Sequence, residues 1–126
     1  MPKLFLIGLG GFCGACTRYL LSGAAHRWFS ASFPTGTLLV NMAGCLCMGA
    51  LMYLAEERQL LGPEGRMLLM VGFLGSFTTF SSVEYETFDM IRSGQMLQAS
   101  WNIALNFVLG MAALIAGWTG LRLLHL

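Results

Sequence analysis

The sequence is poor in charged residues, which make up 10% of its 126 residues, against about 25% in ordinary soluble domains. Hydrophobic residues make up 56%, and a small domain has too much surface to cover with so few charges. The composition argues against a soluble monomer. It also argues against a disordered chain, which needs low hydrophobicity and high charge. The formal net charge of +1 provides no basic face, so nucleic-acid binding is not expected.

Long runs without charge point instead to an integral membrane protein. The few charges fall in clusters that separate apolar segments, each long enough for a membrane-spanning helix. Pro34 and the turn residues Gly62 and Pro63 mark two of the boundaries. The sequence therefore predicts an all-α fold with one membrane domain, 1–126, and four spans at about 4–25, 35–55, 67–88 and 99–122.

Lysine and arginine give only a weak bias between the two sides of the membrane. With four spans, both termini and the middle loop share one side. Four cationic residues lie there against two or three on the other side: Lys3, Arg58, Arg66 and Arg122 against Arg27, Arg92 and, if the first helix ends early, Arg18. Under the positive-inside rule, two interpretations stay open. Either the chain has a single topology with its termini inside, or it inserts both ways and pairs antiparallel.

Small residues within the first span predict close helix packing. Gly10 and Gly14 form a G-x-x-x-G pair, which lets two backbones approach closely in lipid. Cys13 and Cys16 lie in the same apolar segment with no histidine or carboxylate nearby in the sequence, so we expect them to be small buried hydrophobes. No nucleophile–base set or metal-ligand cluster is apparent, and an enzyme is not expected.

Polar residues at membrane depth are costly and ask for an explanation. Thr37 and Asn41 lie four residues apart on one helix face, and so do Asn102 and Asn106. Such pairs can hold a bundle together by interhelical hydrogen bonds. Two aligned pairs, with a polar third span, favour a polar path through the bundle.

The third span is rich in glycine and hydroxyl residues between positions 71 and 83. Such residues weaken a continuous helix and can satisfy the freed backbone groups. We therefore expect a broken helix, which can expose carbonyl oxygens to a cation and N–H groups to an anion. Glu84, Glu86 and Asp89 follow it, and we expect them near the membrane surface.

Together these residues resemble the CrcB/Fluc family of small fluoride channels. The resemblance covers the whole chain, and its order and spacing make it specific. The matching stretches are Gly11-x-x-Gly14-Ala15-x-x-Arg18-Tyr19, Gly36-Thr37-Leu38-x-Val40-Asn41-x-x-Gly44 and Gly72-Phe73-x-Gly75-x-x-Thr78-Thr79-Phe80-Ser81, with Glu86 and the series Asn102, Asn106 and Gly110.

The resemblance implies a passive channel that exports fluoride across a prokaryotic inner membrane and so lowers its cytoplasmic concentration. It implies an antiparallel, dual-topology homodimer in lipid, with two pores between the subunits. A structural sodium ion is implied at the dimer centre, held by the backbone carbonyls of Gly75 and Thr78. The implied fluoride-pore residues are Arg18, Thr37, Asn41, Thr79, Phe80, Ser81, Ser82, Val83, Glu86, Asn102 and Asn106.

One departure from the family pattern affects the implied pore. Val83 stands where the family usually has a second phenylalanine, three residues after Phe80, and Ser76 stands where glycine is usual. Valine offers no electropositive ring edge to an anion. We therefore expect Phe80 to keep the stronger aromatic contact. The alternative is that the ring of Tyr85 or Phe77 occupies the place of the phenylalanine that Val83 replaces.

Two other functions are weighed against the channel. A small multidrug-type proton-coupled transporter needs a carboxylate inside the membrane, and the first span has no Asp or Glu. A non-transporting membrane subunit would account for the glycines but not for the polar third span.

Overall fold

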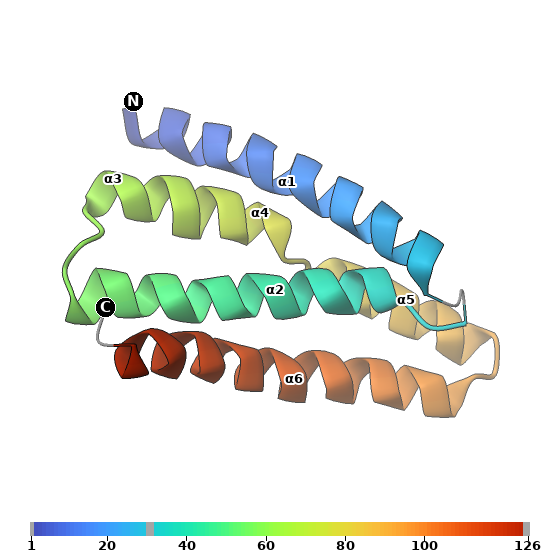
Figure 1. Ribbon diagram of the computed structural model, residues 1–126. Coiled ribbons are helices and arrows are strands. Elements are labelled where there is room, and N and C mark those ends of the chain that lie inside the picture. Colours follow the sequence, from blue (N-terminus) through green and yellow to red (C-terminus); the bar gives the residue numbers. More distant parts are fainter. Residues whose placement is uncertain (1, 30–31, 125–126) are drawn as a thin grey trace.

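The computed structural model describes residues 2–29 and 32–124, which form an all-helical bundle whose successive spans run in alternating directions (Figure 1). Within these residues, four helical stretches are long and apolar enough to cross a membrane: Pro2–Trp28, Thr35–Glu57, Pro63–Arg92 and Met96–Leu123. The predicted all-α class is confirmed, and a helical stretch able to span a membrane covers each of the four predicted spans. The stretches reach up to a few residues beyond the predicted spans, because a helix continues past the apolar run until its end groups are capped or solvated.

Each span has its own helical elements. The first is α1 (Pro2–Trp28), and the fourth is α6 (Met96–Leu123). The second starts as α2 (Thr35–Met52) and ends in π-helical turns, η1 (Tyr53–Glu57). The third comprises α3 (Pro63–Gly65), the π-helical η2 (Arg66–Leu74), α4 (Gly75–Phe77) and α5 (Phe80–Arg92).

The α2–α6 and α1–η2 contacts are the most extensive in the bundle. Gly14 of α1 lies against η2 so closely that a Cβ there would overlap the carbonyl oxygen of Phe73. Gly49 of α2 lies equally close to the carbonyl of Leu114 on α6. The close glycine packing predicted for the first span is therefore confirmed. A glycine also lets the backbones of α2 and α6 approach closely.

The cysteines of α1 are placed differently from the sequence prediction. Cys13 and Cys16 are exposed on the outer face of the subunit, so the expectation that they are buried is wrong. Gly10 and Gly14 take the face of α1 that packs on η2, and the cysteines fall on other faces. Large apolar side chains such as Phe12 are also exposed there, as expected for a surface that faces lipid or another subunit.

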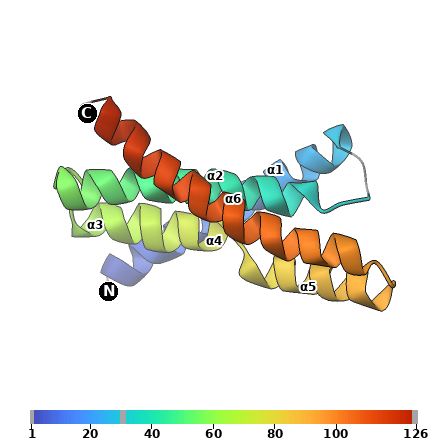
Figure 2. The same ribbon diagram turned by 90° about the horizontal axis from the view of Figure 1, so that it is seen from below.

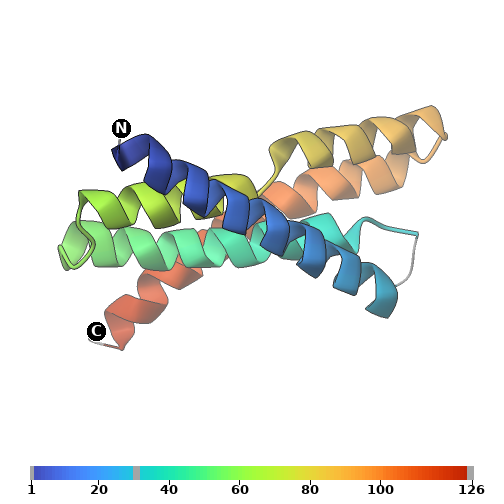
Figure 3. The same ribbon diagram turned by 90° about the horizontal axis from the view of Figure 1, so that it is seen from above.

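The third span changes direction between α4 and α5. Figures 2 and 3 show α5 leaving the line of α3 and α4 and lying beside α6. Thr78 (φ −78°, ψ 154°) and Thr79 (φ −148°, ψ 111°) are extended at this step. The N–H and the Oγ1 hydroxyl of Thr78 both donate to the carbonyl of Leu74, which closes the end of α4. A short buried cluster of Val40, Leu74 and Phe77 packs beside the step.

Candidate functional site

The extended step is held by the side-chain amide of Asn41. Thr79 N–H donates to Asn41 Oδ1 at 2.8 Å, and Asn41 Nδ2 donates to the Thr79 carbonyl at 3.2 Å. The amide thus takes the place of a neighbouring peptide group where the helix offers none. The Thr79 hydroxyl then accepts from Ser82 N–H at 3.2 Å and caps the start of α5.

A chain of amides continues from Asn41 into the fourth span. Asn41 Nδ2 also donates to Asn106 Oδ1 at 3.0 Å, and Asn106 Nδ2 donates to Asn102 Oδ1 at 3.1 Å. The fully buried Asn102 donates to the Thr87 hydroxyl at 3.0 Å. The asparagines of the two i, i+4 pairs therefore meet in one network that joins α2, α5 and α6.

Thr37, which forms the i, i+4 pair with Asn41 in the sequence, makes its side-chain hydrogen bond outside this amide network. Its buried hydroxyl donates to Oε1 of Glu86 on α5. The other oxygen, Oε2, is buried and has no hydrogen-bond partner among the described residues. Glu86 is half-buried between α2 and α5, and it lines a pocket of about 250 Å³ together with His26 and Asp89.

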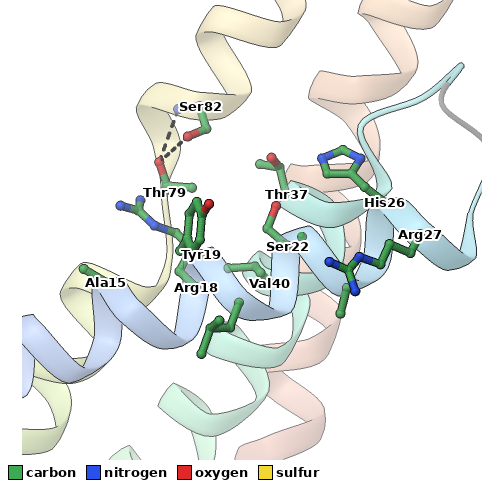
Figure 4. A pocket seen from close by; sticks show the side chains of 13 residues that line it. Ala15, Arg18, Tyr19, Ser22, His26, Arg27, Thr37, Val40, Thr79 and Ser82 are labelled. Atoms are coloured by element: carbon green, nitrogen blue, oxygen red, sulfur yellow. Dashed lines mark hydrogen bonds between the residues drawn. The ribbon is translucent and has the colours of Figure 1, made fainter.

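A larger cavity, pocket 1, lies between α1, α2 and the start of α5 and measures about 620 Å³. Arg18 and Arg27 give this cavity cationic groups, and His26 adds an imidazole ring (Figure 4). Hydroxyl groups come from Thr37, Thr79 and Ser82. The Thr79 hydroxyl lies 2.9 Å from that of Ser82 and 3.4 Å from that of the exposed Ser81. Thr79, Ser81 and Ser82 therefore form one hydroxyl cluster at the step.

A second cavity, pocket 2, lies between α2, the step with the start of α5, and α6, and it measures about 300 Å³. Polar groups of Asn41, Thr79 and Asn106 lie among its walls, and Phe80, Val83 and Phe107 are among its apolar residues. Thr79 lines both pockets, so both cavities adjoin the extended step, where the Asn41 amide pairs with the Thr79 backbone (the amide clamp). Phe77 and Tyr85 are not among the described residues that line pocket 2.

Phe80 and Val83 both line pocket 2 but differ in burial. Phe80 is 77% exposed, whereas Val83 is 5% exposed and its carbonyl accepts from Asn102. The two residues therefore differ in burial although both line the same cavity. A helical turn takes 3.6 residues, so two residues three apart do not lie directly above one another. This difference places Val83 on the buried side of α5 and leaves Phe80 on the exposed side.

The end of α4 leaves two carbonyl oxygens without their usual helical donors. In a continuous helix, Thr79 N–H would bond the Gly75 carbonyl and Ser82 N–H would bond the Thr78 carbonyl. Here these N–H groups donate to Asn41 Oδ1 and Thr79 Oγ1 instead. Carbonyl oxygens are hard donors that suit a cation such as sodium, so Gly75 and Thr78 fit the ion that the family resemblance implies. Within the described residues, no cluster of histidine, cysteine and acidic side chains offers a different metal site.

Comparison with known proteins identifies the family. The family described as "CrcB-like protein, Camphor Resistance (CrcB)" matches residues 5–118. The chain belongs to this CrcB family. With four helices able to cross a membrane, this CrcB protein is an integral membrane protein.

Three relatives of this CrcB protein illustrate the similarity. The chain is 45% identical to "Fluoride-specific ion channel FluC" of Maridesulfovibrio salexigens, over 93% of each chain. It is 42% identical to "Fluoride-specific ion channel FluC 1" of Methanosarcina acetivorans, over 93% of this chain and 88% of the relative. It is 40% identical to the channel of the same name from Nitratidesulfovibrio vulgaris, over 96% of this chain and 95% of the relative. These relatives are named as channels and not as enzymes.

Proposed function

We propose that this CrcB protein is a fluoride-specific, passive ion channel that lets fluoride leave the cell across its inner membrane. Relatives that align over nearly the whole chain carry the name of such a channel. The observation that carries the proposal is the amide clamp between Asn41 and Thr79, which lies where pocket 1 meets pocket 2.

The residues along the two pockets suit a small, strongly hydrated anion. Arg18 and Arg27 attract anions into pocket 1. The hydroxyls of Thr79 and Ser82 are donors that can replace the water lost from fluoride. Both N–H groups of the Asn41 amide already donate, to the Thr79 carbonyl and to Asn106, so this amide serves an anion by giving up one of these two bonds. Beyond the step, the ring edge of the exposed Phe80 offers partial positive charge.

Glu86 and Thr37 form a polar contact at one end of this route. Their hydrogen bond lies between pocket 1, which Thr37 lines, and the smaller cavity that Glu86 lines. We propose that this pair forms one end of the fluoride pathway. Asn102 and Asn106 support the pathway from the fourth span by orienting the Asn41 amide.

The working unit is proposed to be an antiparallel, dual-topology homodimer. The weak lysine and arginine bias permits both orientations. Exposed aromatic residues on α1 and α5, Phe80 among them, supply apolar surface for a second copy within the lipid. The interruption of the third span at Thr78 and Thr79 would then lie near the two-fold axis, where the carbonyls of Gly75 and Thr78 from both copies would hold a sodium ion. The ion would supply positive charge that favours anions nearby.

The test is efflux from proteoliposomes loaded with fluoride and followed with a fluoride electrode, with a potassium ionophore to dissipate the voltage. We expect rapid release of fluoride from vesicles that contain the protein and slow release from empty ones. Matched vesicles loaded with chloride should retain their chloride. Retention of fluoride, or equal release of the two halides, would overturn the proposal.

A further inference from the structure

Pocket 2 contains one charged group among the described residues that line it, the carboxylate of Glu84. Glu84 lies on α5 one turn after Phe80, and both side chains are exposed. Glu84 makes no ion pair and no side-chain hydrogen bond with any residue that the structure describes. No countercharge of these residues therefore neutralises the carboxylate beside the pocket.

The same pocket is lined by polar groups beside the extended step. Asn41, Thr79 and Asn106 line it together with Glu84, in a space of about 300 Å³. An anion that enters this space would share a small cavity with a carboxylate of the same sign. Like charges at such short range repel each other strongly, and the repulsion grows where protein and lipid replace water.

The charged residues that line pocket 1 are cationic. Arg18 and Arg27 line it, and no carboxylate is found among its described lining residues. Because Thr79 belongs to both cavities, an anion that crosses the step passes from a cationic wall to an anionic one. The electrostatic barrier on this route therefore lies on the side of pocket 2, beside Phe80 and Glu84.

We propose that Glu84 sets the throughput of this channel by lowering the occupancy of pocket 2 by small anions. The inference rests on the proposed function. It gives a role to Glu84, which the proposed fluoride pathway does not otherwise include. Charge repulsion acts alike on all monovalent anions. Glu84 therefore limits the rate of passage, and the choice between fluoride and chloride stays with the donors that replace water.

The experiment compares initial fluoride efflux of wild type, Glu84→Gln and Glu84→Asp in proteoliposomes. Glu64→Gln is the matched control, because Glu64 is exposed on α3 and lines none of the three pockets. Efflux is measured at ionic strengths of about 0.01 M and about 1 M, which change the Debye length from about 30 Å to about 3 Å. The salt should be one whose anion does not permeate the channel.

At low ionic strength we expect Glu84→Gln to raise the initial efflux rate about threefold to tenfold, because it removes the repelling charge. The ratio to wild type should fall towards one at high ionic strength. Glu84→Asp, which keeps the charge, should stay within about twofold of wild type, and Glu64→Gln should match wild type. Should Glu84→Gln not elute as a folded protein, Glu84→Ala removes the same charge and must show the same increase.

The outcomes separate this inference from the function on which it rests. If Glu84→Gln and wild type release fluoride at the same rate at low ionic strength, the role of Glu84 is overturned. The channel function is then unaffected. An equal increase in Glu64→Gln also overturns it, because the effect would then be one of general surface charge. Wild-type vesicles that release no more fluoride than empty ones would overturn the channel function, and the role of Glu84 with it.

Discussion

The side-chain amide of Asn41 pairs with the backbone of Thr79 through two hydrogen bonds, at 2.8 and 3.2 Å, across the extended step between α4 and α5. The same amide nitrogen also donates to Asn106. One side chain of α2 therefore pairs with both backbone groups of Thr79 in the interrupted third span and ties this residue to α6. Because buried backbone groups without partners are costly in a membrane, this contact lets the chain keep an extended step beside two pockets.

Replacing Asn41 with aspartate should nearly abolish fluoride efflux. Asp keeps the oxygen that accepts from Thr79 N–H but loses the donor to the Thr79 carbonyl and to Asn106. The loss of these donors and the new negative charge beside the pathway should slow efflux about a hundredfold, which corresponds to a barrier about 2.7 kcal/mol higher. Initial rates in proteoliposomes measure the effect, and elution as a folded species is the control. Efflux close to that of wild type would mean that Asn41 only holds the bundle together.

Phe80→Ile should slow fluoride efflux far more than any change at Val83. Phe80 is exposed at pocket 2 and presents a ring, whereas Val83 is buried beside Asn102. Val83→Phe should alter throughput measurably, because the larger side chain must enter pocket 2 or displace its wall. Paired efflux assays of the two variants make the comparison. Equal and negligible effects at both positions would show that ring edges do not contact the anion here.

Gly14→Ala should destabilise the folded subunit by about 1–3 kcal/mol. A Cβ at this position overlaps the carbonyl of Phe73, and backbone must move to admit it. Gly8→Ala on the same helix is the matched control, since a Cβ there meets nothing within 4 Å. Thermal unfolding in detergent, followed by the loss of the monodisperse elution peak, should separate the two variants. Indistinguishable transitions would argue against the tight α1–η2 contact.

Arg18→Gln should reduce fluoride efflux at low ionic strength and much less at high ionic strength. Arg18 lines pocket 1, and its charge raises the local concentration of anions. We expect a loss of about threefold to tenfold at about 0.01 M ionic strength. Arg122→Gln is the control, because Arg122 is exposed at the end of α6 and lines none of the three pockets. A loss that salt does not change would indicate a structural role for Arg18.

Dual topology can be tested at Gly62, in the loop before α3. A Cβ there meets nothing within 4 Å, so Gly62→Cys should be tolerated in a variant without the four native cysteines. An impermeant thiol reagent should label about half of the molecules from outside sealed cells and the rest only after permeabilisation, because the charge bias is too weak to fix one orientation. Labelling from one side only would contradict the antiparallel homodimer and would require a partner of opposite orientation.

Much of the fold could be read from the sequence because the signals for it are local. Spans follow from apolar length and from where the charges fall, and the structure confirms four of them. The close approach at Gly14 was also predictable, because a G-x-x-x-G pair leaves room for another backbone. The i, i+4 spacing is also sufficient to predict that Asn41 and Asn106 lie on polar helix faces.

Tertiary structure alone decided which faces turn inward and which groups meet. In a lipid-facing helix both the buried and the outer face are apolar, so hydropathy does not tell them apart. For this reason the burial of Cys13 was mispredicted. The meeting of Asn41 with Thr79 and the presence of Glu84 in pocket 2 depend on how three spans cross. The sequence determined that polar groups lie within the membrane, and helix packing determined which of them share a pocket, because such contacts join residues that are distant along the chain.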